Sequence, residues 1–172
     1  MKNLFISLVL ITIAIGERLW FDLGPNVELV MTASVLASIY LGRRWGVGVA
    51  LVSLMISDFF LGNSLIMIFT WSAFALIAFG GKMIKGPLMG AGYGLVGALF
   101  FYFYTNFGVW LIGNLYPHTF SGLINCYMMG LPFLRLQAVG SMVFLGSTIS
   151  LIKLFNLRIW VSRCKSGAVP QL

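Results

Sequence analysis

The chain has 172 residues, of which 60% are hydrophobic and only 9% carry a charge. A soluble domain has about 25% charged residues, so this chain has too few to cover a water-facing surface. It is therefore predicted to be an all-α integral membrane protein with one domain, and its continuous apolar runs disfavour a β-barrel. The net charge of +7 comes from basic residues at predicted helix ends, where membrane topology explains them better than nucleic-acid binding.

The first apolar stretch runs from Leu4 to Phe21 and follows Lys2. A lysine, an apolar run and Ala14-Ile15-Gly16 also resemble a signal peptide that would be cleaved before Glu17. A retained helix is favoured, because the apolar character resumes at Leu19-Trp20-Phe21 and the stretch reaches spanning length only when it is uncut. Both alternatives stay open at this stage.

Two predicted helices carry small residues four apart, which let helices approach closely in lipid. The second helix, from about Val27 to Leu41, has Ala33 and Ala37. The fifth helix begins at Gly86-Pro87 and ends in the aromatic cluster of residues 100–104. Its small residues at this spacing are Gly86, Gly90, Gly94 and Ala98. Both sets are interpreted as helix-packing residues.

The third helix is predicted from Trp45 to Leu61, and its 17 residues span about 25 Å, close to one hydrocarbon thickness. It follows Arg43 and Arg44, and an arginine pair favours the cytoplasmic side of a membrane. Asp58 lies near its other end. This helix therefore predicts which end of the bundle faces the cytoplasm.

The second half of the chain is predicted to complete six membrane-spanning helices. The fourth helix runs from Ser64 to about Gly80, and the sixth runs from Pro132 to about Ile152. Between the fifth and sixth, residues 106–131 are interrupted by glycines, asparagines and Tyr116-Pro117-His118. We expect two short helical pieces there, on the outer interface or folded over the bundle.

Residues 1–153 are predicted to form one six-helix transmembrane domain, and residues 154–172 a basic cytoplasmic tail. Six spans place both termini on the cytoplasmic side. Nine of the eleven basic residues then lie there, namely Lys2, Arg43, Arg44, Lys82, Lys85, Lys153, Arg158, Arg163 and Lys165. All four acidic residues lie toward the outside, namely Glu17, Asp22, Glu28 and Asp58.

Several segments carry a resemblance to a known family. At residues 42–46 (GRRWG) and 57–62 (SDFFLG) the chain resembles the substrate-binding S-components of energy-coupling factor (ECF) transporters. It resembles more closely a group of uncharacterised bacterial membrane proteins labelled S-component-like. That likeness is carried by residues 40–44 (YLGRR), Ser57-Asp58, residues 106–111 (NFGVWL), Tyr116-Pro117, and Cys126-Tyr127 through Pro132-Phe133. The resemblance covers roughly residues 30–145.

The resemblance implies a binding subunit in the bacterial cytoplasmic membrane that takes a vitamin, a vitamin precursor or a related micronutrient from the outer side. It also implies partners, a transmembrane coupling subunit and two ATPase subunits. S-components usually carry Ala-x-x-x-Ala on the first helix, whereas this chain has Thr12-x-x-x-Gly16 there and its alanine pair on the second helix. No vitamin-specific signature is present, so the ligand is not carried over.

The predicted outer half gathers polar and aromatic residues that suit a binding pocket. The polar residues are Glu17, Arg18, Asp22, Glu28, Asp58, Asn63, Asn106, Asn114, His118, Asn125 and Arg135, with Trp71, Trp110 and Tyr127 nearby. We expect Asp58, Asn106 and Arg135 to contact a small polar ligand. Trp71 and Trp110 would pack on its ring, and Glu17 is a further candidate.

Each of these residues has a structural alternative. Glu17 could pair with Arg18, Asp58 could cap a helix or pair with Arg135, and Trp110 could be an interface residue. His118 and Cys126 are weak metal candidates, because a lone histidine without a set of further ligands makes no site. No metal or cofactor is predicted.

The sequence favours a binding protein over two other classes. An intramembrane hydrolase needs a nucleophile with a base, but the chain has one histidine and no G-x-S-x-G or H-E-x-x-H motif. It also lacks a Walker A motif, so ATP-driven transport would need partner ATPases. The alternative to a binder is a structural or assembly subunit whose small-residue ridges bind other membrane helices.

Overall fold

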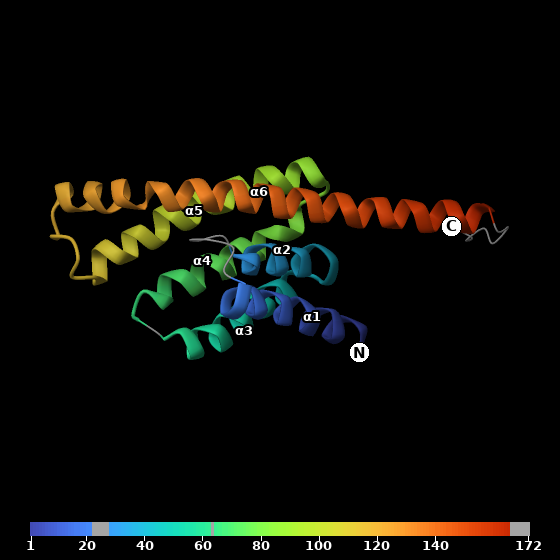
Figure 1. Ribbon diagram of the computed structural model, residues 1–172, viewed down its shortest axis with the longest axis horizontal. Helices are drawn as coiled ribbons and strands as arrows, with labels where there is room; N and C mark the ends of the chain where they lie inside the picture. The colour runs from blue at the N-terminus through green and yellow to red at the C-terminus, as the bar shows by residue number, and fades with distance from the viewer. Residues whose placement is uncertain (22–27, 63, 166–172) are drawn as a thin grey trace.

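The computed structural model describes residues 1–21, 28–62 and 64–165, with side chains to residue 156. Every element in these residues is helical, which confirms the all-α prediction. Figure 1 shows the elements in order: α1 (Lys2–Gly16), the π-helical turn η1 (Glu17–Phe21), α2 (Leu29–Leu41), α3 (Arg43–Leu61), α4 (Met67–Gly80), the 3₁₀ turn η2 (Gly81–Met83), α5 (Pro87–Ile112) and α6 (Phe120–Lys165).

The described part of the chain has four helical segments that are long and apolar enough to cross a membrane. They are Lys2–Phe21, Arg43–Leu61, Pro87–Ile112 and Phe120–Asn156. Many large apolar side chains on α5 and α6 are exposed, among them Val96, Phe103, Val139 and Val143. Such a surface suits contact with lipid. The fold is therefore compatible with a helical membrane protein.

The remaining helices, α2 and α4, are shorter, and α2 occupies the centre of the bundle. Its 13 residues reach about 20 Å. Residues 30–38 are all buried, because α2 packs against α1, α3, α4 and α6. A helix that is apolar on every side is stable only inside a protein or a membrane. The continuous apolar character of α2 thus matches its central place.

The described charged residues gather at opposite ends of the bundle. At one end, Lys82 Nζ donates to the carbonyl of Ile39 at 3.2 Å, and Lys153 Nζ donates to the carbonyl of Lys85 at 3.0 Å. Arg43, which begins α3, lies at this same end. Asp58 follows it by 15 residues along α3, which is roughly 22 Å.

Small residues lie where helices meet. A Cβ on Gly94 would lie 2.6 Å from the backbone oxygen of Ser141 on α6, so α5 and α6 approach closely there. Gly90 faces Ile149 of α6 in the same way. Ala33 and Ala37 are 3% and 0% exposed within α2. Gly86 lies instead just before α5, close to Lys153.

The prediction for residues 106–131 is wrong. They are not two interfacial pieces: α5 continues to Ile112, residues 113–119 form the connection, and α6 begins at Phe120. Pro132 lies inside α6 rather than in its first turn. Gly130 allows close packing on Asn106 and Tyr102, so it breaks no helix. Figure 1 shows α6 continuing past the other helices. The helix ends only at Lys165, so it includes residues 154–165, which were predicted to belong to the tail.

Candidate functional site

A buried ion-pair cluster joins three segments of the bundle. Arg18, in the η1 turn, places Nη2 2.6 Å from Oδ1 of Asp58 on α3. Its Nη1 lies 2.7 Å from Oε2 of Glu28, which directly precedes α2. The side chains of Arg18 and Asp58 are only 11% and 10% exposed. Buried charges persist only when they are paired, so the cluster fixes η1 against α2 and α3.

Trp71 completes the hydrogen bonding of Asp58. Its indole Nε1 donates to Oδ2 of Asp58 at 2.7 Å, while Oδ1 receives Arg18. Both carboxylate oxygens therefore have partners. Because Trp71 belongs to α4, the cluster also connects α3 to α4.

Glu17 lies beside the cluster but has a different partner. It is 5% exposed, and its Oε2 accepts a hydrogen bond from the backbone N–H of Leu29 at 2.9 Å. This N–H is one of the amide groups at the start of α2 that no helical carbonyl can reach. The carboxylate also faces the positive end of the α2 dipole. In this structure Glu17 thus caps α2.

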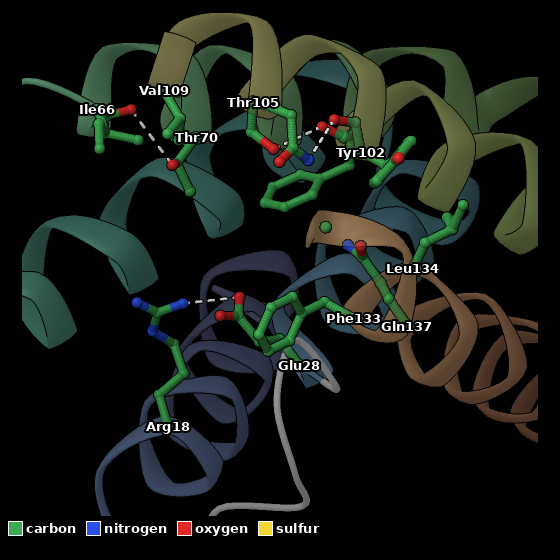
Figure 2. A pocket seen from close by; sticks show the side chains of 13 residues that line it. Arg18, Glu28, Ile66, Thr70, Tyr102, Thr105, Val109, Phe133, Leu134 and Gln137 are labelled. Atoms are coloured by element: carbon green, nitrogen blue, oxygen red, sulfur yellow. Dashed lines mark hydrogen bonds and ion pairs between the residues drawn. The ribbon is translucent and has the colours of Figure 1, made fainter. Parts of the chain in front are cut away.

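A cavity of about 310 Å³ lies next to the cluster. It is lined from η1, α4, α5, α6 and the residues that precede α2 and α4. Its polar lining residues are Arg18, Glu28, Thr70, Tyr102, Thr105, Asn106 and Gln137, and its apolar ones are Ile66, Phe101, Val109, Gly130, Phe133 and Leu134. Figure 2 shows Arg18 and Glu28 on one side of this space, with Thr105 and Tyr102 on the other.

Most polar groups on the α4 and α5 walls donate to their own helix. Thr70 donates to the carbonyl of Ile66, and Thr105 to the carbonyl of Phe101. The Asn106 amide donates to the carbonyl of Tyr102 at 2.8 Å. The hydroxyl donors of the two threonines and one N–H of the Asn106 amide are therefore used within the protein. Their oxygen atoms, which have further lone pairs, remain available as acceptors at the cavity wall.

Gln137 differs from these residues. It is only 4% exposed and lines the cavity from α6, yet its carboxamide makes no hydrogen bond with any residue that the structure describes. Burying an amide without partners is costly, most of all in a membrane protein. A bound molecule or water in the cavity would supply the missing partners.

Glu28 is the most accessible member of the ion-pair cluster. Its side chain is 26% exposed, against 11% for Arg18, and it lines the cavity. Its Oε2 is the oxygen that Arg18 Nη1 contacts. Burial raises the pKa of its carboxyl, and the charge of Arg18 opposes that effect.

The predicted ligand-binding residues are only partly brought together. Asn106 lines the cavity, and Asp58 and Trp71 lie behind Arg18. Trp110 points to the α5–α6 connection, where its Nε1 donates to the carbonyl of Pro117 at 3.1 Å. Arg135 is exposed on α6. The suggested pairing of Asp58 with Arg135 is wrong, since Asp58 pairs with Arg18.

The two weak metal candidates, His118 and Cys126, lie in different environments. His118 is exposed in the α5–α6 connection and contacts the ring of Trp110. Cys126 is buried in α6, with its Sγ 3.4 Å from the carbonyl of Asn106. Within the described ranges, no three potential ligands gather around one point. Asp22 and Asn63, also predicted in the outer half, lie outside the described residues.

Sequence reasoning missed the part that Gln137 has in this site, and it gave Arg18 and Glu28 too little weight. The available signal for Gln137 was its isolation, because it is the only amide in the apolar segment from Pro132 to Ile152. For Arg18, the signal was a basic residue within a group of acids at the predicted outer end. Intramembrane polar residues of both kinds usually mark paired or functional positions.

These features define a helical protein compatible with a membrane, with a small-molecule-sized cavity beside a buried ion-pair cluster. The chain belongs to a family of unknown function, DUF6580, which it matches over residues 1–163. No curated protein and no solved structure matches it.

Proposed function

We propose that this protein binds a small polar molecule in the cavity and serves as the substrate-binding subunit of an ECF-type uptake transporter for a micronutrient. Two independent features support the proposal. One is the resemblance of residues 30–145 to S-component-like proteins. The other is the cavity, whose volume of about 310 Å³ lies at the lower end of the range for ligand pockets.

The observation that carries the proposal is the unpartnered carboxamide of Gln137. A protein that uses a cavity only as a packing defect is expected to line it with apolar groups. Here a buried amide on α6 lies at the cavity, together with the oxygen of Asn106 on α5 and the carboxylate of Glu28. Few but convergent polar groups among apolar walls are typical of a ligand site.

In the proposed arrangement all six helices cross the bacterial cytoplasmic membrane. The basic end faces the cytoplasm, in keeping with the positive-inside rule, and both termini lie there. The cavity then belongs to the outer half. The shorter α2 meets this arrangement because protein, rather than lipid, surrounds it.

The proposed partners are a transmembrane coupling subunit and two ATPases, since the chain itself has no Walker A motif. Ala33 and Ala37 are buried inside the bundle and are not available to dock a partner. The outer face of α1 is open instead, with Phe5, Leu8 and Ile13 exposed. We propose α1 as the face that meets the coupling subunit.

The proposal is distinguished from a structural subunit by what the small residues do. The ridges of α2 and α5 that suggested contacts with other proteins are used inside this chain: Ala37 is fully buried in α2, and Gly94 of α5 packs against α6. A subunit that only joins other helices also has no need of a polar cavity. The non-catalytic binding function is therefore the one we favour.

Native mass spectrometry of the full chain, purified in mild detergent, tests the proposal. We expect a co-purifying small molecule on the wild-type protein and an occupancy about tenfold lower for Gln137→Leu, because the ligand loses a buried hydrogen-bonding partner. Arg135→Leu is the matched control on the exposed side of α6 and should retain wild-type occupancy. An empty wild-type protein, or equal occupancy in both variants, would contradict the proposal.

A further inference from the structure

We infer that the molecule held by this cavity is a small organic cation, an ammonium-bearing compound with an apolar body. The inference rests on the proposed function and assigns the charge class of its ligand. It is argued from the balance of charges around the cavity, from which charged group is accessible, and from the chemistry of the remaining walls.

The ion-pair cluster beside the cavity sums to a negative value. Among the described residues, Arg18 is the only cation that lines the cavity, and it is paired with Glu28, which also lines the cavity, and with Asp58, which lies behind Arg18. That cluster has a net charge of −1 when all three groups are ionised.

No other described element changes this balance. The segments α4 and α5 contain no charged residue, and Arg135 of α6 is exposed rather than at the cavity. A ligand with a negative charge would therefore meet uncompensated carboxylate charge in a poorly screened interior. A cation would bring the balance to neutrality.

The accessible charge is also the negative one. Glu28 lines the cavity and is 26% exposed, more than twice the fraction of Arg18, and it is Oε2 of its carboxylate that Arg18 contacts. An ammonium group has only donors, so it matches a carboxylate, which has only acceptors. Glu28 is thus the group that would receive the ligand's charged end.

The other walls suit the rest of such a molecule. Phe101, Tyr102 and Phe133 line the cavity, and aromatic faces attract cations as well as apolar groups. The oxygen of Asn106 and the free carboxamide of Gln137 offer acceptors for further N–H or O–H groups. Figure 2 shows Phe133 between Glu28 and Gln137, so one small molecule can contact all three.

Three probes with one ring and different charges test the inference: benzylammonium, benzyl alcohol and benzoate. Their affinities for the purified full-length protein in detergent are measured by calorimetry, with thermal shift as a second readout. We expect benzylammonium to bind about tenfold or more tightly than benzoate, with benzyl alcohol between them. Equal affinities, or tighter binding of benzoate, would overturn the inference while leaving the proposed binding function intact.

Three variants locate the preference. In Glu28→Gln the cation should lose about tenfold in affinity while benzyl alcohol is unchanged, whereas Arg135→Gln should keep the wild-type order. Gln137→Leu leaves the ion pairs in place and should weaken all probes by similar factors, so it remains informative if Glu28→Gln does not fold. A cation preference that persists in folded Glu28→Gln would overturn the role of Glu28.

If the wild-type protein binds none of the probes, the charge of the ligand is tested by native mass spectrometry. If native mass spectrometry finds a co-purifying molecule, its charge decides: a cation supports the inference, and an anion or a neutral molecule overturns it. If neither a probe nor a native molecule binds, the proposed function fails, and the inference fails with it.

Discussion

Arg18 pairs with two carboxylates from different parts of the chain, so the charge of each carboxylate is compensated only while Arg18 is in place. With 11% of its side chain exposed, its charge is largely removed from solvent. Removing one partner of such a pair leaves a buried charge without compensation, which commonly costs about 3–5 kcal/mol. The cluster is therefore the position where single substitutions should act most strongly.

Asp58→Asn is expected to lower the free energy of unfolding by about 3 kcal/mol, because Arg18 then keeps only Glu28 as a counter-ion. Trp71→Phe removes one hydrogen bond to the same carboxylate and should lower it by about 1–2 kcal/mol. Thermal and denaturant unfolding in detergent, followed by circular dichroism, measures both. The double variant should lose less than the sum, because asparagine at position 58 has one acceptor oxygen in place of two, for which Trp71 and Arg18 would already compete.

Additive effects in that cycle would show that Trp71 stabilises the protein through packing alone. An unchanged stability in Asp58→Asn would mean that Arg18 finds another partner. Either result would contradict the network of bonds as the structure has it.

At the scale of helices, the contact between α5 and α6 depends on glycine at the crossing point. A side chain at Gly94 would meet the backbone of Ser141, which cannot move aside as a flexible side chain can. Gly92, on the same helix, is exposed and has no heavy atom within 4 Å of a Cβ built on it. Substituting alanine at Gly94 and at Gly92 therefore separates the effect of helix packing on stability from the effect of helix propensity.

Gly94→Ala is expected to lower the free energy of unfolding by about 1–3 kcal/mol, because the two helices must separate to admit the methyl group. Gly92→Ala should be neutral or stabilising by up to about 1 kcal/mol, since alanine favours a helix more than glycine does. Equilibrium unfolding in the same detergent compares them. Equal effects of the two substitutions would show that α5 and α6 do not pack through Gly94.

The end of α5 and the start of α6 are where the prediction of helices failed. Gly108 and Gly130 are unfavourable in a helix in water, and together with the asparagines and Tyr116-Pro117-His118 they suggested a broken segment. In the structure Gly108 packs against Phe69 and Gly130 against Asn106, so both glycines permit contacts inside continuous helices. Apolar surroundings favour an intact helix because unpaired backbone groups have no water to bond with.

For the whole molecule, the separation of charges predicts its orientation. In a background with Cys126→Ser and Cys164→Ser, we expect His118→Cys to react with a membrane-impermeant maleimide added to intact cells. Lys85→Cys should react only after permeabilisation, because the basic end is held on the cytoplasmic side. Both native residues are exposed, at opposite ends of α5, so accessibility to the reagent reports the compartment.

Reaction of both positions from the same side would contradict an α5 that crosses the membrane. Reaction of Lys85→Cys alone in intact cells would invert the proposed orientation and place the cavity toward the cytoplasm. That second result would be consistent with the fold but would contradict the proposed uptake from outside.

The candidate site was predictable in part. Asp58 and Asn106 could be named from the sequence, because polar residues in apolar helices are few and their side of the bundle follows from helix length. Arg135 and Trp110 were named for the same reason but turn away from the cavity, since a position near one end does not say which face of the helix looks inward. Gln137, two residues after Arg135, lies on the side of α6 that lines the cavity.

The sequence alone determined that this chain forms apolar helices, because too few polar groups exist to satisfy water or an open backbone. The positions of the charged residues along those helices also predicted that the charges divide between the two ends. Only the tertiary structure decided that Arg18 pairs with Asp58 and Glu28 and that Gln137 meets a cavity. The distances that select these partners join residues up to 40 positions apart, and they are set by how the helices pack. The residues next to Arg18 in the sequence do not show which carboxylates will pair with it. A buried charge is nevertheless stable only when it is paired, so packing must supply these partners.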